Sequence, residues 1–369
     1  MGPLQGIRIL EFGSIGPGPF AAMVLADLGA DIIRLQRAGA TGPVSSARTA
    51  DRRGRVEVDV NLKDPEDVAL IKELVKEADA IIEGFRPGVM ERLGLGPDEL
   101  LAINPKLVYG RMTGYGQDGP LAKVPGHDIN YISIAGTLGA IKRVDEKPLF
   151  PLNLLGDYGG GAMFLIVGVL AGVLEAQRSG EGQVVDVAMI DGVATLSTLF
   201  HGMARDGVWR APAGTNILDS GAHFYEVYEC SDGKYFSVGA IEPQFYTDLL
   251  QRIGFDEAEM PEWDMDQWAA FKEQMVALFK TKTRDEWTEL LEPYDACATP
   301  VLDLKEAKEH PHNVARGAYT ADGLPVAAPR FSRTPGDAER EVPSQEDALR
   351  AWGVSADALS ALRDRSQVA

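Results

Sequence analysis

The chain has 369 residues, of which 45% are hydrophobic and 25% are charged. This composition is ordinary for a globular protein of two or three domains, and it excludes a disordered tail, a collagen-like fibre and a small disulfide scaffold. Acidic residues outnumber basic ones by 55 to 36, which gives a net charge of −19. A surface this negative repels nucleic-acid phosphates and anionic lipid, so we expect neither a nucleic-acid partner nor a membrane partner.

Cysteines and apolar segments bear on the cellular compartment. Cys230 and Cys297 are too few for a disulfide framework or a cysteine-rich zinc site, and so low a count fits a reducing compartment. The N-terminus lacks the basic region and the apolar stretch of a signal peptide. The longest apolar run, 162–174, is shorter than the roughly 20 residues that span a membrane. We therefore expect a cytoplasmic protein.

Strand and helix signals alternate through the first half of the chain. A β-rich run at 6–12 leads into a glycine-rich loop and a helix, and a second strand follows at 31–36. Asp64 and Pro65, as N-cap and first helical residue, begin another helix. This alternation predicts a parallel sheet in a doubly wound, Rossmann-like α/β domain over residues 1–190. Further elements are expected as strands at 80–85, 106–114 and 183–189 and as a helix at 157–176.

The composition changes after residue 190. A linker is expected over 191–219, where glycine, proline and polar residues become frequent. The segments 224–230 and 234–240 flank a Ser-Asp-Gly turn, which predicts a β-hairpin. Helical stretches with three tryptophans follow, so we expect a smaller α+β domain over 220–300.

The loop after the first strand matches a nucleotide-binding pattern. Residues 16–21 read Gly-Pro-Gly-Pro-Phe-Ala, which fits the G-x-G-x-x-A fingerprint between a strand and a helix. Pro17 and Pro19 remove two N–H donors that a pyrophosphate would need, and Arg37 stands where an acidic residue would bind the ribose. Two interpretations stay open: an NADP site, as in an oxidoreductase, or a tight strand-to-helix turn.

Basic residues gather in one short segment of this acidic chain. Arginine forks and lysine ammonium groups suit phosphate oxygens, so a phosphorylated adenine nucleotide is the predicted ligand. A solvated basic face or intersubunit ion pairs would explain the same cluster. The basic residues are Arg34, Arg37, Arg48, Arg52, Arg53, Arg55 and Lys63, and Arg86 and Arg92 follow the next expected strand.

Three separated residues are candidates for acid–base chemistry. His127 stands at an expected loop-to-helix junction, and an imidazole titrates near working pH. Asp157 stands at an expected helix start, where the helix dipole would lower the pKa of the carboxyl and an apolar pocket would raise it. Glu242 follows an expected strand and precedes Pro243. For each of the three, a structural role such as helix capping is the alternative.

Taken in order, these and neighbouring segments resemble the alpha-methylacyl-CoA racemases, within the family III CoA-transferase superfamily. The resemblance extends from the first strand to PRFSRTPG at 329–336. A series of such segments in this order is far more specific than any single motif. The most specific are IIEGFRPGVMERLGLGP, GRMTGYGQDGP, GHDINYISIAGTL, PLNLLGDYGGGAMFL and VGAIEPQFY.

The resemblance implies a fold and an assembly. A large Rossmann-like domain would comprise 1–190, completed by about 325–369. Linkers at 191–219 and 301–324 would join it to the smaller α+β domain at 220–300. Family members form interlocked homodimers, in which one subunit's large domain meets the other subunit's small domain at each active site. We therefore expect a homodimer with an interlocked arrangement.

The resemblance also implies roles for individual residues. His127 and Asp157 would be the two acid–base groups, and Glu242 would orient the histidine. We expect the Asp157 backbone N–H to donate to the enolate oxygen of the intermediate. The ligand of the basic cluster would be the phosphorylated ADP of CoA rather than NADP. The implied CoA contacts are Arg37, Val60, Asn61, Leu62, Lys63, Gly84, Phe85, Arg86, Arg92, Gly126, Asp128, Ile129, Asn130 and Tyr131.

The implied activity is that of a racemase or epimerase that interconverts R and S 2-methylacyl-CoA thioesters. One group removes the α-proton to give an enolate, and the other returns a proton on the opposite face. Neither a metal nor a separate cofactor is expected, since CoA is part of the substrate. Three alternatives stay open: a family III CoA-transferase with Asp157 as nucleophile, an NADP-dependent oxidoreductase, and a CoA-binding protein without activity. His127 and Glu242, which the transferase reaction does not need, favour the racemase.

Overall fold

The computed structural model describes residues 2–37 and 50–359, and the chain divides into two compact units. The first unit contains the N-terminal and C-terminal parts of the chain, and the second is formed mainly from its middle. The first comprises Met1–Ala135, Pro151–Ser197 and Gly317–Ala369, and the second comprises Gly136–Phe150 and Thr198–Arg316.

The boundaries of the two units differ from the predicted domain and linker boundaries. The predicted linker 191–219 divides between the units, with 191–197 in the first and 198–219 in the second. Residues 136–150, predicted in the large domain, belong to the second unit. An ion pair explains this placement, because Arg143 Nη2 lies 2.8 Å from Oε1 of the buried Glu226. The start of the predicted return linker also belongs to the second unit, where Arg284 pairs with Glu306 at 2.8 Å.

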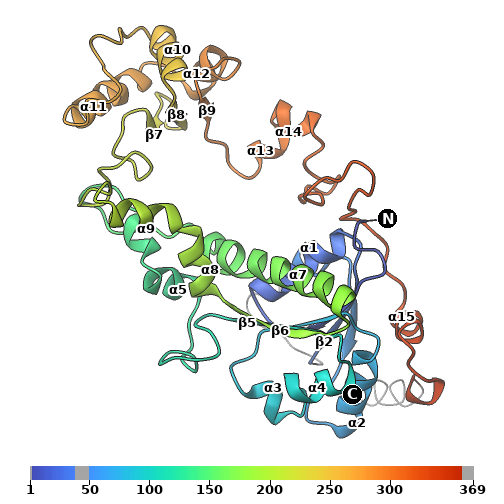
Figure 1. The fold of residues 1–369 in the computed structure, drawn as a ribbon. Helices are drawn as coiled ribbons and strands as arrows, with labels where there is room; N and C mark the ends of the chain where they lie inside the picture. Colours follow the sequence, from blue (N-terminus) through green and yellow to red (C-terminus); the bar gives the residue numbers. More distant parts are fainter. Residues whose placement is uncertain (1, 38–49, 360–369) are drawn as a thin grey trace. The chain divides into compact units, whose positions relative to one another are not determined.

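The first unit is built on a sheet of six parallel strands, which confirms the predicted α/β architecture (Figure 1). The strand order, β3-β2-β1-β4-β5-β6, reverses direction between β1 and β4, as in Rossmann sheets. Strand β3 is not predicted from the sequence, because it is short and lies within the basic segment. The strands are β1 (Arg8–Phe12), β2 (Asp31–Gln36), β3 (Val56–Asp59), β4 (Ala80–Glu83), β5 (Val108–Thr113) and β6 (Gln183–Ala188).

Burial on both faces explains the composition of the inner strands. Every residue of β4 and β5 is buried. Parallel strands covered on both faces need such continuous runs, because neither face meets water. Leu10 of β1 pairs in register with Ile33 of β2 and with Ile81 of β4. The centre of the sheet is therefore the centre of the hydrophobic core.

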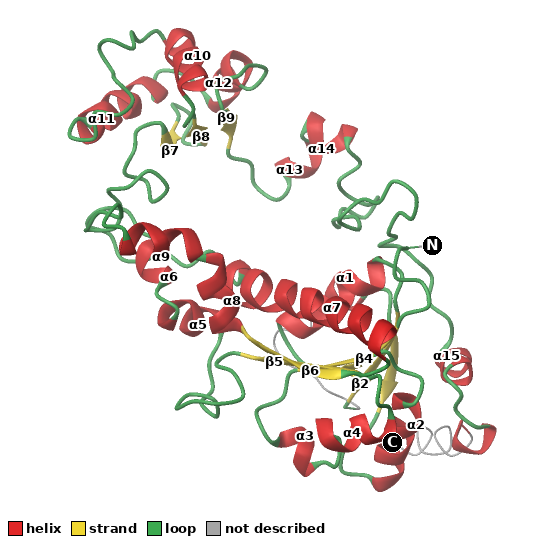
Figure 2. Cartoon of the chain, viewed as in Figure 1, coloured by secondary structure: helices red, strands yellow, loops and turns green. Residues whose placement is uncertain are grey.

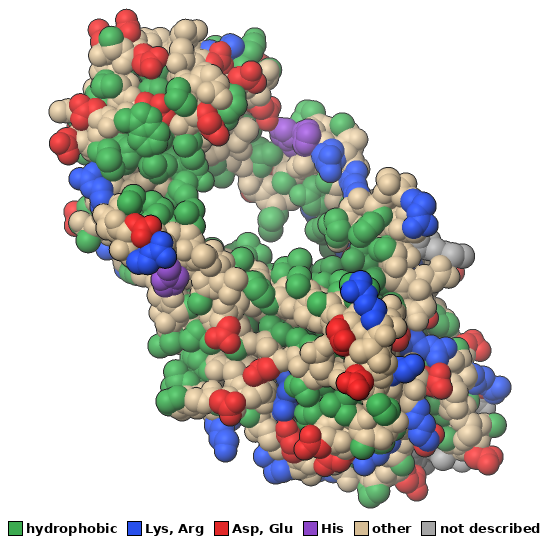
Figure 3. All heavy atoms as spheres, in the orientation of Figure 1, with side chains coloured by type: hydrophobic (Ala, Val, Ile, Leu, Met, Phe, Trp, Pro, Cys, Tyr) green, Lys and Arg blue, Asp and Glu red, His purple; other side chains and the backbone are tan. Residues whose placement is uncertain are grey.

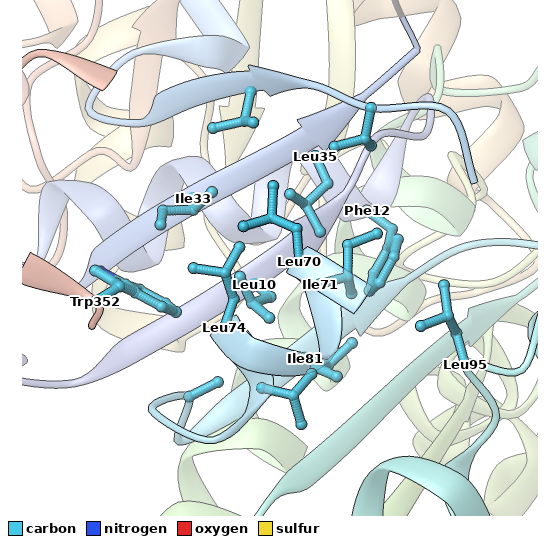
Figure 4. Packing of buried hydrophobic residues seen from close by; sticks show 14 of the residues in the cluster. Leu10, Phe12, Ile33, Leu35, Leu70, Ile71, Leu74, Ile81, Leu95 and Trp352 are labelled. Carbon is cyan, nitrogen blue, oxygen red and sulfur yellow. The ribbon is translucent and has the colours of Figure 1, made fainter. Parts of the chain in front are cut away.

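Helices α2 and α4 pack on one face of this sheet together with α15 (Figure 1). Asp64 caps α2 by accepting a hydrogen bond from the Glu66 N–H at 2.9 Å, and Pro65 begins the helix as predicted. Leu74 and Trp352 pack against the sheet (Figure 4). The helices are α2 (Pro65–Val75), α3 (Val89–Arg92), α4 (Pro97–Ile103) and α15 (Gln345–Ala351).

Helices α1 and α7 pack on the opposite face (Figure 1). A π-helix, η3, runs directly into α7. Together they form a helix of 26 residues that is long and apolar enough to cross a membrane by length and composition alone, although half of its most apolar window is buried within the protein. Packing on the sheet accounts for the apolar residues on the buried side of this helix. The elements are α1 (Pro17–Asp27), η2 (Ala50–Arg52), α5 (Asp128–Ile134), η3 (Leu154–Ala162), α7 (Met163–Ser179) and α8 (Met189–Leu196).

The second unit contains a three-stranded antiparallel sheet in the order β7-β8-β9 (Figure 2). β7 and β8 form the hairpin that the sequence predicts, and β9 is an addition. Aromatic rings fill the core, where Tyr228 stacks on Phe279 with centroids 5.0 Å apart. The elements are β7 (Tyr225–Glu229), β8 (Tyr235–Gly239), β9 (Ala298–Pro300), α6 (Thr137–Ala140), α9 (Thr198–Arg205), α10 (Pro243–Ile253), α11 (Trp268–Phe279), α12 (Arg284–Leu291), α13 (Glu306–Glu309) and α14 (Pro311–Ala315).

Candidate active site

Predicted CoA contacts in the first unit follow the carboxyl ends of neighbouring strands. Arg37 follows β2, the segment 60–63 follows β3, and the segment 84–86 follows β4. Because the strands are parallel, these ends lie along one edge of the sheet. This edge includes the point between β1 and β4 where the strand order reverses, which is where open α/β sheets bind their ligands. The loops after β1 and β4 meet there, since a Cβ built on Gly84 would lie 3.2 Å from Ser14 Cβ.

Two arginines of the predicted phosphate-binding cluster are internal, which corrects that prediction. Arg34 and Arg55 are buried, and both pair with the fully buried Glu11. They also donate to backbone carbonyl oxygens of the glycine-rich loop, Arg34 to Ser14 at 3.4 Å and Arg55 to Pro19 at 2.9 Å. Their guanidinium groups therefore hold the loop and cannot reach a phosphate.

Further members of the cluster are also paired. Arg53 binds Asp27 at 2.6 Å, and Arg52 lies 3.6 Å from Glu57. Arg48 lies outside the described residues. The cluster that remains for a phosphate is therefore smaller than the sequence predicts.

Four exposed basic residues at or near the sheet edge are still available to bind a phosphate. They are Arg37, Lys63, Arg86 and Arg92, which come from three separate segments of the chain. On the face drawn in Figure 3, basic and acidic side chains are interspersed over the first unit. The strand order, rather than one basic stretch of sequence, is what supplies cations to this edge.

The glycine-rich loop lies beside Asp157. A Cβ built on Gly16 would lie 3.0 Å from Asp157 Oδ2, and Gly16 has a φ of +75°, which favours glycine. The ring of Phe20 stacks on Tyr158 at 4.3 Å. Of the two interpretations of this loop, the geometry supports a tight turn, and this turn forms one wall around the Asp157 carboxylate.

His127 occupies the predicted loop-to-helix junction. It is the N-cap of α5, and its backbone N–H donates to Asn130 Oδ1 at 3.0 Å. The preceding Gly126 packs on Tyr131, whose ring would lie 2.7 Å from an added Cβ and whose hydroxyl donates to the Gly126 carbonyl. These contacts hold the backbone on both sides of His127, and the residue itself is exposed.

Asp157 lies in the first turn of a helix, but this helix is the π-helix η3, which begins at Leu154, rather than the predicted α-helix that begins at 157. π-helical turns are rare and are often found at functional sites. The carboxylate is half-buried, and Asn153 Nδ2 donates to its Oδ2 at 3.1 Å. Burial raises the pKa of Asp157, although the Asn153 hydrogen bond opposes this change. The sequence leaves open whether the pKa of Asp157 is raised or lowered, and burial decides that it is raised.

Charged neighbours from the segment of His127 affect the pKa of Asp157. The charge of His127 lowers the pKa of Asp157, whereas that of Asp128 raises it. Tyr131 belongs to the same region, because burial and nearby groups that include Asp157 raise the pKa of its phenol to about 12. His127 and Asp157 therefore lie in one region of the first unit, beside Gly16.

The Asp157 backbone N–H has an acceptor within the protein, and its role as donor to an enolate oxygen stays a prediction. This nitrogen lies 2.8 Å from Asp128 Oδ2, and the Gly156 nitrogen lies 2.6 Å from the same oxygen. Asp128 itself is buried. Its side chain is therefore used inside the protein, and only its backbone is available for the CoA contact that the resemblance implies.

Glu242 belongs to the second unit, whereas His127 and Asp157 belong to the first. It is the N-cap of α10, and Pro243 follows at the first helical position. Its side chain is exposed and makes no capping hydrogen bond. Capping therefore does not explain this carboxylate, and its contact with His127 stays a prediction.

The other predicted CoA contacts differ in what they can offer a ligand. Val60 is buried in the core and contributes only its backbone. The Asn61 side chain accepts the Lys63 N–H at 3.1 Å and so shapes the turn after β3. The remaining residues divide into the half-buried Leu62 and Phe85 and the exposed Gly84, Ile129 and Asn130.

Asn153, which donates to the Asp157 carboxylate, is missed by the sequence analysis. Its spacing of four residues from Asp157 would reveal it if the helix were expected to begin one turn earlier. Within residues 2–37 and 50–359, no group of three His, Cys, Asp or Glu side chains is placed to hold a metal ion.

Known sequences and structures resemble this chain over most of its length. Residues 4–347 match the model of CoA-transferase family III. The chain belongs to this family. It is 42% identical over 362 residues to the alpha-methylacyl-CoA racemase of Mus musculus, covering 95% of this chain and 94% of that protein. It is 41% identical over 337 residues to the alpha-methylacyl-CoA racemase of Homo sapiens, covering 90% and 87%.

A solved structure supports the family assignment. The crystal structure of Rv3272 from M. tuberculosis, orthorhombic form, is 26% identical in sequence and has a TM-score of 0.75. The match covers 92% of this chain and 95% of that one. The resemblance seen in the sequence is therefore confirmed at the level of the family and of the fold.

Proposed function

We propose that this protein interconverts the R and S forms of 2-methylacyl-CoA thioesters. The observation that carries the proposal is the hydrogen bond from the Asp157 N–H to Asp128 Oδ2 at 2.8 Å, which brings the segments of His127 and Asp157 together. The mouse and human relatives, both named alpha-methylacyl-CoA racemase, support the same activity.

The reaction needs one proton-transfer group on each face of the α-carbon. His127 removes the α-proton of the S epimer, the C–H electrons pass into an enolate, and protonated Asp157 returns a proton to the opposite face. The R epimer reacts in the reverse direction, with Asp157 as the base. Because burial raises the pKa of Asp157, its acid form persists to higher pH than in an ordinary aspartate. That form is needed for the S epimer.

The CoA part of the substrate binds the enzyme through its phosphates. Arg37, Lys63, Arg86 and Arg92 are exposed and suit the phosphates of its ADP group. The thioester itself makes the α-proton acidic, so we expect neither a metal nor a cofactor beyond CoA.

We also propose a cytoplasmic homodimer. The second unit carries Glu242 and the first carries His127. By the family resemblance, a complete site would combine Glu242 of the partner subunit with His127. Cys230 and Cys297 are free thiols, as a reducing compartment allows.

A CoA-transferase is the second candidate, because the family is named for that activity. Such an enzyme would use the Asp157 carboxylate as a nucleophile and would need it ionised. The raised pKa of Asp157 and the nearby His127 both suit proton transfer better.

Proton NMR in heavy water separates the two candidates. Each epimer of a small panel of acyl-CoA thioesters, with branched-chain, sterol side-chain and aryl-propionyl groups, is incubated without any acceptor acid. We expect the α-proton signal to disappear from both epimers of at least one thioester as R and S forms mix. Retention of the α-proton together with transfer of CoA to an added carboxylic acid would replace the racemase with the transferase.

A further inference from the structure

We propose that Asp128 is a positioning residue that sets the separation between the two proton-transfer groups. This inference rests on the proposed two-base reaction. Asp128 follows His127 directly in the chain, and its side chain binds the backbone at Asp157. One residue thus joins the two segments that carry the acid–base pair.

The hydrogen bonds that make this connection are short and buried. Asp128 Oδ2 accepts the Gly156 N–H at 2.6 Å and the Asp157 N–H at 2.8 Å, and Asp128 is only 5% exposed. Hydrogen bonds to an ionised carboxylate are stronger than those between neutral groups. Gly156 is required for this approach, since a Cβ there would lie 2.6 Å from Asp128 Oδ2.

The π-helix explains why this segment needs an external acceptor. Each N–H in a π-helix bonds to the carbonyl five residues earlier, so the first N–H groups have no acceptor within the helix. Gly156 and Asp157 lie in that first turn of η3. Leu152, just before it, has a φ of +54°, an unusual conformation that surrounding contacts must maintain. Asp128 supplies two of those contacts to the segment that follows.

The second carboxylate oxygen of Asp128 indicates that charge matters as well as shape. Asp128 Oδ1 is buried and has no hydrogen-bond partner among residues 2–37 and 50–359. A buried, half-satisfied carboxylate is costly, and an amide would satisfy the same two N–H groups with one oxygen. The negative charge has an effect that an amide would not reproduce, because it raises the pKa of Asp157.

The groups around Asp157 decide how a pH test is interpreted. From α5 and its N-cap, Asp128 raises and His127 lowers the Asp157 pKa, and the Tyr131 phenol lies nearby. Asn153, from the turn before η3, lowers it through a hydrogen bond. The nearest neighbour from the glycine-rich loop is Gly16, and α1 and α8 contact η3 through uncharged groups such as a proline, a valine and a methionine.

Two variants separate geometry from charge. Asp128→Asn keeps one oxygen acceptor and removes the charge, whereas Asp128→Ala removes both. Asp98→Asn, at an exposed position of α4, is the matched control for loss of one negative charge. For each variant we would measure α-deuterium exchange from both epimers against pH, the KM for acyl-CoA, thermal unfolding, and hydrogen exchange of the Gly156 and Asp157 amides.

The expected results differ between the variants. Asp128→Ala should unfold cooperatively, lose at least about 100-fold in kcat for both epimers because the groups move apart, and change KM about threefold or less. Its two amides should exchange rapidly. Asp128→Asn should keep these amides protected and most of the kcat. In the plot of exchange rate against pH for the R epimer, the rise on the acid side should move to lower pH. Asp157 is the base for this epimer, and removing the neighbouring charge lowers its pKa.

Specific outcomes would overturn the proposal. Wild-type amide protection in Asp128→Ala would show that the carboxylate does not hold this segment, and a loss confined to KM would make Asp128 a CoA contact. If Asp128→Ala does not fold, rapid exchange of the Gly156 and Asp157 amides in the wild type would overturn the inference, because these N–H groups donate to Asp128. A wild-type protein without any α-proton exchange would refute the proposed function, and amide protection would still decide whether Asp128 holds the segment.

Discussion

His127 and Asp157 differ in environment, and the difference suits them to different parts of a proton-transfer cycle. His127 is exposed, so its imidazole can exchange protons with solvent. Asp157 is half-buried, and burial raises the pKa of its carboxyl. A carboxyl that keeps its proton to higher pH suits the step in which Asp157 donates a proton while His127 accepts one.

Replacing His127 tests its assigned role directly. His127→Ala should abolish α-deuterium exchange from the S epimer, because His127 is the proposed base for that epimer, and should leave the affinity for CoA close to that of the wild type. Isothermal titration with CoA and NMR of the S epimer check both statements. Loss of CoA affinity in this variant would make His127 a binding residue.

Replacing Arg37 should affect substrate binding and leave the chemical step intact, unlike the replacement of His127. Arg37→Ala removes a cation that acts on the remote CoA phosphates, so KM for acyl-CoA should rise several-fold while kcat changes little. An unchanged KM would remove Arg37 from the site.

The π-helix η3 is the element on which the site depends most. Gly160 of η3 and Gly192 of α8 lie in direct backbone contact, since a Cβ built on Gly192 would lie 1.9 Å from the Gly160 carbonyl oxygen. A glycine pair therefore allows α8 to support the wide turn that carries Asp157. The sequence places a helix here but cannot indicate its π geometry, because that geometry depends on α8 and on Asp128.

Gly192→Ala should separate α8 from η3. We expect destabilisation by about 1–3 kcal/mol, as for overpacking in a dense core, together with slower α-proton exchange from both epimers. Urea unfolding and NMR exchange measure the two effects. Gly202→Ala on α9 is the matched control, because nothing lies within 4 Å of its added Cβ. This control should be neutral or slightly stabilising, and equal effects of both substitutions would refute the packing argument.

The division into two units bears on the molecule as a whole. His127 and Asp157 lie in one unit and Glu242 lies in the other. In the proposed dimer, Glu242 of the partner subunit would orient His127, so neither subunit would hold a complete site alone.

Complementation between subunits tests this arrangement. His127→Ala and Glu242→Ala chains, each with a different affinity tag, are co-expressed, and the mixed dimer is purified through both tags. If the site is shared between subunits, one site of the mixed dimer keeps both residues, so about half of the wild-type exchange rate should return. If each site is formed within one subunit, both sites carry a lesion. The mixed dimer would then be as weak as the single variants.

Local patterns in the sequence predict much of the fold and part of the site. Continuous apolar runs indicate the inner strands, and the Asp64–Pro65 pair indicates the start of α2. Glycine and proline before His127 indicate its place at the N-cap of α5. Each of these signals depends on a few adjacent residues, so the sequence alone contains it.

Pairing between distant residues is what only the tertiary structure decides. Glu11 and Arg34 face each other because β1 and β2 pair in that register, and this contact turns a predicted phosphate ligand into a buried ion pair. The link from Asp128 to Asp157 likewise depends on α5 packing against η3. A linear sequence indicates which residues carry charge, but it does not indicate which charges are removed from water by a partner. Packing of the strands and helices determines that.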